Sequence, residues 1–147
     1  MEKILIRASL VGDKTKYDGK SNYHPLIKEL LEHFELVPFC PEVEGGLKTP
    51  RNPSERKGTK VVMDNGKDVT SNFLEGAEKA YNICNYLGIK LAILKERSPS
   101  CGVNEIYDGN FSHKTIKGMG VTAEYLKSKG IKVISENDIE FLLANLK

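Results

Sequence analysis

The sequence predicts an α/β fold, a single three-layer Rossmann-like or flavodoxin-like domain with a mostly parallel sheet of about four strands. Short apolar runs alternate along the chain with stretches whose apolar residues recur at helical spacing. The chain has 147 residues, which suffices for one domain, residues 1–147, with a buried core. Right-handed crossovers make 2-1-3-4 the simplest spatial order of the strands.

The first half of the chain contains two predicted strands and one helix. Residues 3–9 are short and apolar, as buried parallel strands are. A helix is expected over residues 25–34, with a proline in its first turn, and a second strand over residues 35–39. Residues 44–58 are rich in glycine, proline and charge, so we expect a long loop there.

The second half opens with a predicted hairpin, in which an Asn65–Gly66 turn joins residues 60–63 to residues 67–69. Thr70 is the expected N-cap of a helix over residues 71–87. Beyond it we expect a strand, an irregular segment, a helix, a strand and a final helix, at residues 91–94, 103–120, 122–129, 131–134 and from 135 onward.

Composition excludes several classes of protein. The net charge of +2 gives no strong basic field for duplex DNA or RNA. No apolar run approaches the length of roughly 18 residues that a membrane helix needs. Three widely spaced cysteines form neither a disulfide framework nor a CxxC pair, and the start of the chain carries no signal peptide. We therefore expect a protein of the reducing cytoplasm.

Polar and thiol side chains follow three strands that the predicted order makes neighbours. Ser9, Cys40 and Cys101 stand at the carboxyl ends of the first, second and third main strands. Open α/β sheets bind ligands in the crevice at such ends, so two thiols and one hydroxyl are expected to converge there. Cys84 lies on the packed face of a predicted helix and is expected to be a small buried hydrophobe.

Two cysteines at one crevice are typical of either a soft-metal site or a thiol chemistry site. Glu42, two residues after Cys40, is a candidate acid–base group, and a solvated loop carboxylate is the alternative. Arg51, Arg56 and Lys57 lie in the long charged loop. They suit contact with a ribose phosphate or a tRNA backbone, or simple solvation.

The motifs together resemble one family, the thiouracil desulfidases, over nearly the whole chain. The resemblance is carried by short motifs in four parts of the sequence, which are Tyr17-Asp18-Gly19, residues 37–51 (VPFCPEVEGGLKTPR), residues 98–102 (SPSCG) and residues 117–122 (KGMGVT). It implies an enzyme that replaces the sulfur of a thiolated pyrimidine, such as 2-thiouracil or its nucleoside, by oxygen and releases sulfide.

The resemblance also implies a cofactor, a 4Fe–4S cluster held by three cysteines with one iron left open for the substrate sulfur. The matching metal ligands are Cys40 and Cys101, and the third cofactor-binding position is Ser9, where the family pattern has a cysteine. Serine is a harder and weaker ligand for iron than a thiolate. This departure predicts a poorly held cluster and impaired activity.

For this chemistry, three further residues are candidates for catalytic roles because they stand beside Cys40 or Cys101 in the sequence. Glu42 is the expected general base, and Ser98 or Ser100 is expected to position water or the pyrimidine oxygen. Two other functions remain open from the sequence. One is a cluster-free module that binds a nucleobase or nucleotide, and the other is a redox protein in which Cys40 and Cys101 exchange between thiols and a disulfide.

Overall fold

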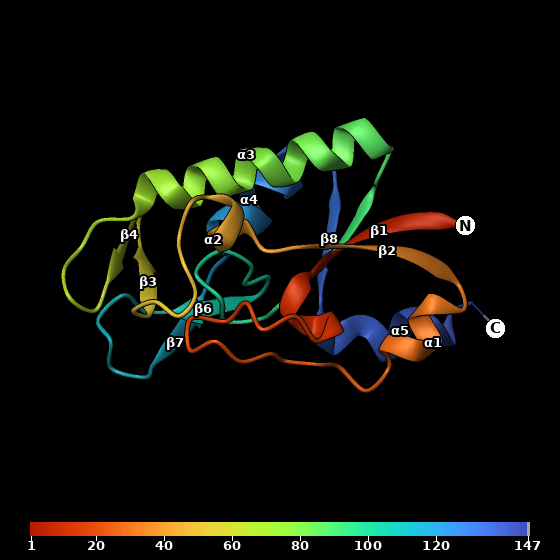
Figure 1. Cartoon of the computed structure of the whole chain (residues 1–147), viewed down its shortest axis with the longest axis horizontal. Helices are drawn as coiled ribbons and strands as arrows, with labels where there is room; N and C mark the ends of the chain where they lie inside the picture. The colour runs from red at the N-terminus through yellow and green to blue at the C-terminus, as the bar shows by residue number, and fades with distance from the viewer. Residues whose placement is uncertain (147) are drawn as a thin grey trace.

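The structure is a computed structural model and describes residues 1–146. Its centre is a parallel sheet of four strands in the order β2-β1-β5-β8, seen edge-on in Figure 1. The strands are β1 (Glu2–Arg7), β2 (Phe34–Phe39), β5 (Leu91–Leu94) and β8 (Lys132–Ser135). Because these are the four predicted main strands, the predicted fold class and the order 2-1-3-4 are confirmed.

Helices cover both faces of the sheet, because successive side chains of a strand point to opposite faces. Leu5 of β1 packs with residues of α3 (Thr70–Leu87) and α4 (Val121–Ser128). Its neighbours Ile4 and Ile6 pack with residues of α1 (Ile27–Leu31) and α5 (Ile139–Ala144). The result is a three-layer domain, with α3 and α4 above the sheet and α1 and α5 below it in Figure 1.

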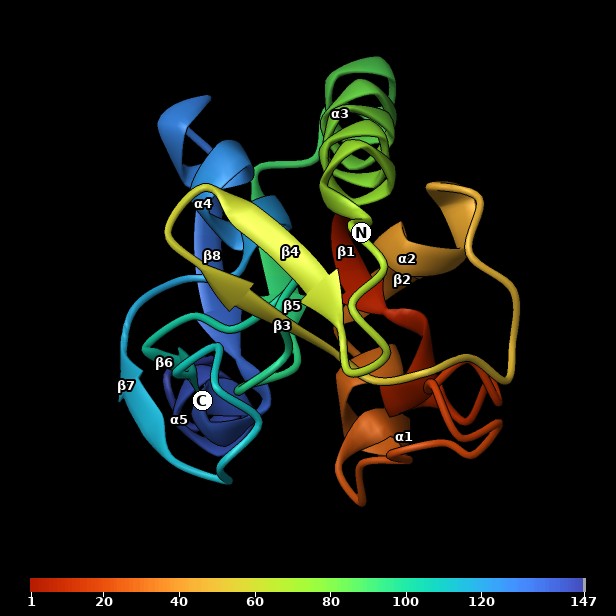
Figure 2. The same cartoon turned by 90° about the vertical axis from the view of Figure 1, so that its left-hand side faces the viewer.

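The register of the sheet brings the ends of its strands together. Arg7 at the end of β1 pairs with Phe39 at the end of β2. Ile6 of β1 pairs with Ile93, one residue before the end of β5. The segments that follow these three strands therefore leave the sheet at one edge, which faces the viewer in Figure 2.

A hairpin stands in front of this edge, and it corrects one prediction. Strand β3 (Ser54–Lys57) pairs antiparallel with β4 (Lys60–Met63), so residues 44–58 are not loop throughout. The predicted turn at Asn65–Gly66 does form, since Met63 N–H donates to Lys67 C=O and Val62 bridges to Asp68. The main partner of β4 was missed because charged Ser54–Lys57 shows no apolar alternation.

Other local elements also differ from the prediction. The chain turns into a short 3₁₀ helix, η1 (Ala8–Val11), directly after β1, so Ser9 lies outside the strand. Helix α1 is shorter than predicted. Helix α3 begins at Thr70 itself, so Val69 takes the N-cap position, and the Thr70 side chain bonds to the backbone of Val61. The remaining unpredicted elements are α2 (Pro41–Glu44), β6 (Glu105–Tyr107), β7 (Thr115–Lys117) and η2 (Glu136–Asp138).

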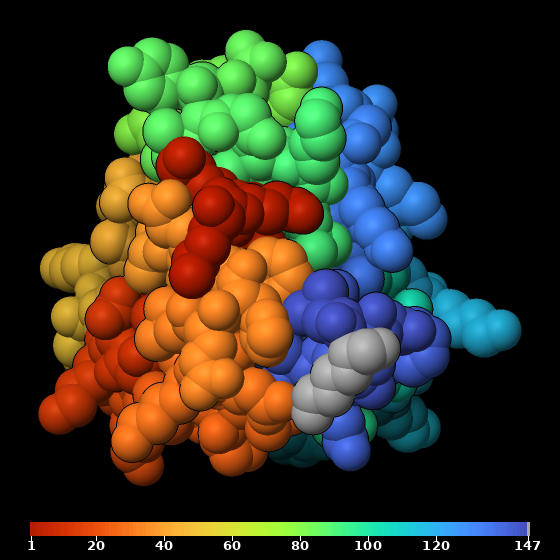
Figure 3. All heavy atoms as spheres, turned by 90° about the vertical axis from the view of Figure 1, so that its right-hand side faces the viewer, coloured from red at the N-terminus to blue at the C-terminus, as the bar shows by residue number. Residues whose placement is uncertain are grey.

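The opposite end of the molecule carries the amino ends of the strands. In Figure 3 the first residues of the chain (red) lie between the end of α3 (green) and the α1–β2 segment (orange).

Within residues 1–146, no helix has the length and apolar character needed to cross a membrane.

Candidate functional site

A cavity of about 590 Å³ opens at the carboxyl edge of the sheet. Its wall includes Arg7 and Ser9 after β1, Glu42 of α2 and Ser98 after β5. The wall also includes residues of the loop after η1, of the segment after β5, of the β3–β4 hairpin and its flanks, and of the region from the end of β6 to β7. The cavity lies where the strand topology predicted a ligand crevice.

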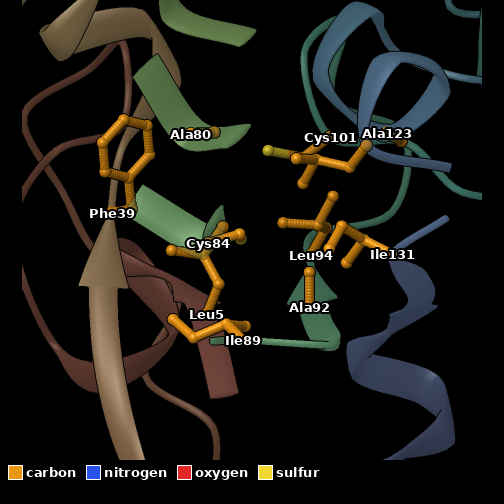
Figure 4. Close-up of a cluster of buried hydrophobic side chains, with 11 residues drawn as sticks. Leu5, Phe39, Ala80, Cys84, Ile89, Ala92, Leu94, Cys101, Ala123 and Ile131 are labelled. Carbon is orange, nitrogen blue, oxygen red and sulfur yellow. The ribbon is translucent and has the colours of Figure 1, made fainter. Parts of the chain in front are cut away.

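The three predicted cofactor positions all follow strand ends, as expected, but they differ in access to the cavity. Ser9 is 1% exposed and belongs to the cavity wall. Cys40 precedes α2 and Cys101 follows β5, and both are buried outside that wall. Figure 4 shows Cys101 within the apolar cluster, its sulfur directed away from Ala123 of α4.

Arg7 stands between the cavity and Cys101. Its Nη1 donates to Cys101 Sγ at 3.0 Å and to Ser98 Oγ at 3.3 Å. Its Nη2 donates to Glu42 Oε1 at 3.0 Å. The side chain is 5% exposed yet contributes to the cavity wall, so its guanidinium separates the Cys101 thiol from any ligand in the cavity.

Glu42 is shared between two arginines. Its Oε1 accepts from Arg7, while its Oε2 accepts from Arg51 Nη2 at 2.8 Å and from Arg51 Nε at 3.2 Å. Arg51 Nη2 also donates to Thr15 C=O at 3.0 Å. This triad, which we call the Arg7–Glu42–Arg51 clamp, holds two cations against one carboxylate and so keeps the Arg7 guanidinium in a fixed position.

Burial and charge set the protonation of these groups in opposite ways. Burial raises the pKa of Glu42, but the charges of Arg7 and Arg51 outweigh it and hold that pKa below its ordinary value. Burial raises the pKa of Cys101 above its ordinary value, and the neighbouring Arg7 offsets only part of this effect. At neutral pH the site therefore holds a carboxylate, two guanidinium groups and a neutral thiol.

Two glycines allow helices to pack closely against the site. A Cβ at Gly76 of α3 would lie 2.0 Å from Pro41 C=O, and one at Gly120 would lie 2.6 Å from Cys101 N. Only hydrogen at these positions permits the approach. Helices α3 and α4 therefore pack directly against the segments that carry Cys40, Glu42 and Cys101 and fix their positions.

The two predicted catalytic serines have different surroundings. Ser98 Oγ lies in the cavity wall and accepts hydrogen bonds from Ser100 N at 3.1 Å and Cys101 N at 3.0 Å. Ser100 is fully buried, and its Oγ lies 2.8 Å from Thr122 Oγ1, outside the wall. Ser98 is placed to meet a ligand, while Ser100 joins the loop to α4.

A second buried carboxylate in the cavity wall, Glu96, was not a predicted site residue. Its Oε1 accepts from the backbone N–H groups of Val103, Asn104 and Glu105 at 2.7, 2.8 and 3.1 Å. Burial raises the pKa of Glu96, but these N–H donors outweigh it and lower that pKa overall. Glu96 thereby fixes the loop that carries Ser98 and Cys101.

Of the remaining residues singled out in the sequence, Cys84, Arg56 and Lys57 lie outside the cavity wall. Cys84 lies on the buried face of α3 and packs with apolar neighbours, as expected. Arg56 Nη1 donates to Met119 C=O at 2.7 Å and Arg56 Nη2 lies 3.2 Å from Glu124 Oε2. Lys57 Nζ donates to Asn110 at 2.7 Å. Arg51, named in the sequence only as a loop cation, is instead a buried part of the clamp.

The groups at the site that could ligate iron are two thiols and one hydroxyl, which do not make a set of three thiolates. Within residues 1–146, no group of three or more His, Cys, Asp or Glu side chains is placed to hold a metal ion. A guanidinium also lies against Cys101 Sγ. As arranged in this structure, the residues do not fit a 4Fe–4S cluster, which thiolates hold.

Comparison with known proteins places the chain among relatives of similar length. A family model described as 2-thiouracil desulfurase matches residues 4–138. The uncharacterized protein YbbK of Bacillus subtilis (strain 168) is 40% identical over 150 residues, which cover 95% of this chain and 99% of YbbK. A solved structure, the [4Fe-4S]-dependent thiouracil desulfidase TudS, is 43% identical with a TM-score of 0.93, covering 99% of this chain and 98% of that one.

Proposed function

Because the chain belongs to the 2-thiouracil desulfurase family, we propose that it removes sulfur from a thiolated pyrimidine of the 2-thiouracil type. The expected resemblance to the thiouracil desulfidases is thereby confirmed. The observation that carries the proposal is the cavity at the carboxyl edge of the sheet, where Arg7, Ser9, Glu42 and Ser98 meet.

The proposed reaction is a hydrolysis. Water adds to the ring carbon that carries the sulfur, the carbon–sulfur bond breaks, and a carbonyl remains. The balance is C=S plus H₂O giving C=O plus H₂S, with no oxidant or reductant. The ring carbon must therefore lie beside a group that positions water, and the sulfur beside groups that stabilise its developing negative charge.

The roles of the chain's own residues follow from the contacts around the cavity. The surroundings of Ser98 support the positioning role predicted for it, because its Oγ contacts Arg7 and the residue borders the cavity. Glu42 was predicted as the general base, but a carboxylate clamped by two arginines with a lowered pKa is a weak base. We assign it instead the positioning of Arg7. The catalytic role predicted for Ser100 stays a prediction.

The size of the cavity favours a free base or nucleoside as the substrate, because small-molecule sites commonly have volumes of roughly 300–1,000 Å³. A tRNA substrate is less well supported. Arg51, Arg56 and Lys57, the loop cations that suited a phosphate backbone, are each engaged within the chain. The three cysteines are unpaired, in keeping with the reducing cytoplasm that we propose as its compartment.

Assay of the purified chain with 2-thiouracil under anaerobic conditions tests this function. We expect uracil and sulfide in equal amounts, with turnover lowered about tenfold or more in Ser98→Ala. Arg56→Ala, which changes an arginine outside the cavity wall, is the matched control and should retain full turnover. Absence of sulfide from 2-thiouracil, 4-thiouracil and their nucleosides would reject the proposal.

A further inference from the structure

Arg7 alters the chemistry at the position where the family resemblance predicts a 4Fe–4S cluster. Its guanidinium contacts Cys101 Sγ at 3.0 Å and is fixed there by Glu42. Ser9, two residues later, offers a hydroxyl instead of a third thiol. Two residues of one short segment therefore act in the same direction, since Ser9 lacks the thiolate of an iron ligand and Arg7 occupies the space beside a second cysteine.

The same two residues carry buried polar atoms without a partner. Arg7 Nε and Ser9 Oγ are both enclosed, and neither has a hydrogen-bond partner in the described chain. Leaving such a group buried and unpaired destabilises the folded chain. Both residues line the cavity, so an acceptor atom of a ligand in the cavity is the group that would satisfy them.

We propose that Arg7 and Ser9 form a metal-free site for the thiocarbonyl of the pyrimidine, in place of the 4Fe–4S cluster. The proposal rests on the proposed function and deepens it. In this site the Nε–H of Arg7 and the hydroxyl of Ser9 donate to the substrate sulfur. Cys101 contacts and supports the guanidinium and does not ligate iron.

The placement of Arg7 and Ser9 suits the negative charge that develops on the substrate sulfur during hydrolysis. As water adds to the ring carbon, the electron pair of the C=S double bond moves onto sulfur. A fixed guanidinium and a hydroxyl directed at that sulfur stabilise the negative charge without rearranging, as donors of an oxyanion hole do. The sulfur then leaves with protons supplied by the water, and the carbonyl forms.

The clamp supplies the rigidity that this role needs. Arg7 has five N–H donors, and three are engaged by Cys101, Ser98 and Glu42. Those three contacts fix the plane of the guanidinium, because they hold it from two separate segments, the loop that carries Ser98 and Cys101 and helix α2 with Glu42. The unengaged Nε–H belongs to the same rigid plane, so its direction is set before a ligand arrives.

Iron content gives the first test. After anaerobic reconstitution with ferrous iron and sulfide, we expect fewer than about one iron per chain in the wild type and in Ser9→Cys, because Arg7 remains in both. The double variant Arg7→Ala/Ser9→Cys should hold about four irons and show the visible absorbance of a cluster. A wild-type chain that retains about four irons would overturn the proposal whether or not the variants fold.

Binding to the iron-free chain gives the second test, with 2-thiouracil titrated by calorimetry. Arg7→Ala should weaken binding about tenfold or more and Ser9→Ala about fivefold, each losing a donor to the sulfur. Arg56→Ala is the control and should bind as the wild type does, with circular dichroism confirming that each variant is folded. Equal binding by folded Arg7→Ala and wild type would contradict the proposal.

The two tests separate this inference from the proposed function. Sulfide release by a wild type that holds four irons would keep the function and reject the metal-free site. Arg7-dependent binding of 2-thiouracil by an iron-free wild type that releases no sulfide would keep the site and reject the function.

Discussion

Glu42 and Glu96 are both buried carboxylates at the carboxyl edge of the sheet, but their partners differ. Glu42 is held by the guanidinium groups of Arg7 and Arg51. Glu96 is held by backbone N–H groups of residues 103–105. A carboxylate paired with backbone dipoles fixes the course of a loop. A carboxylate paired with mobile cationic side chains fixes those side chains instead, and here one of them faces the cavity.

The largest effect is expected from Glu42→Gln, because it leaves two buried arginines with a neutral amide. Breaking a buried ion pair by removing one partner costs about 3 kcal/mol or more. Urea unfolding measures this loss of stability. Binding of 2-thiouracil should fall with it, since Arg7 loses its main anchor. If the variant binds 2-thiouracil with unchanged affinity, the clamp does not position Arg7.

Glu96→Gln should destabilise the chain less, by about 2 kcal/mol. The amide oxygen can still accept from the backbone N–H groups, but the amide NH₂ then faces the Asn104 side chain, which is also a donor. The same unfolding experiment compares the two variants directly. A larger loss for Glu96→Gln than for Glu42→Gln would reverse the comparison drawn above.

Acid should weaken both carboxylate sites. The folded-state pKa values of Glu42 and Glu96 lie below the ordinary value of 4.5. Their contribution to stability is therefore complete above about pH 4.5 and is lost as the pH falls through the lowered values. The stability difference between wild type and each glutamine variant, measured from pH 7 down to about pH 3, should shrink at the acid end. A difference that stays constant over this range would contradict the lowered pKa values.

The smallest effect is expected from Cys84→Ala. Burial raises the pKa of the Cys84 thiol to about 11, so it reacts slowly with thiol reagents at neutral pH. Its loss should cost about 1 kcal/mol of stability and leave 2-thiouracil binding intact. Weaker binding by the folded variant would show that a thiol of the helix contributes to the site.

The sequence predicted the sheet and the ends of its strands, because buried parallel strands are short apolar runs and their order follows from crossover geometry. It also predicted that residues 9, 40 and 101 would follow those ends. Arg51 was predicted only as a loop cation, and no role was predicted for Arg7. Their partnership through Glu42 joins segments far apart in the sequence, and no local pattern reports such a contact. Glu96 was missed because its partners are backbone N–H groups of residues 103–105, which no side-chain pattern reports.

Removal of iron from the wild-type chain tests the central claim most directly. Sulfide release from 2-thiouracil is measured anaerobically on the reconstituted protein, before and after exhaustive treatment with an iron chelator and gel filtration. A site built on Arg7 and Ser9 predicts the same rate of sulfide release in both preparations. Loss of activity with the iron, and its return when iron and sulfide are restored, would contradict the account.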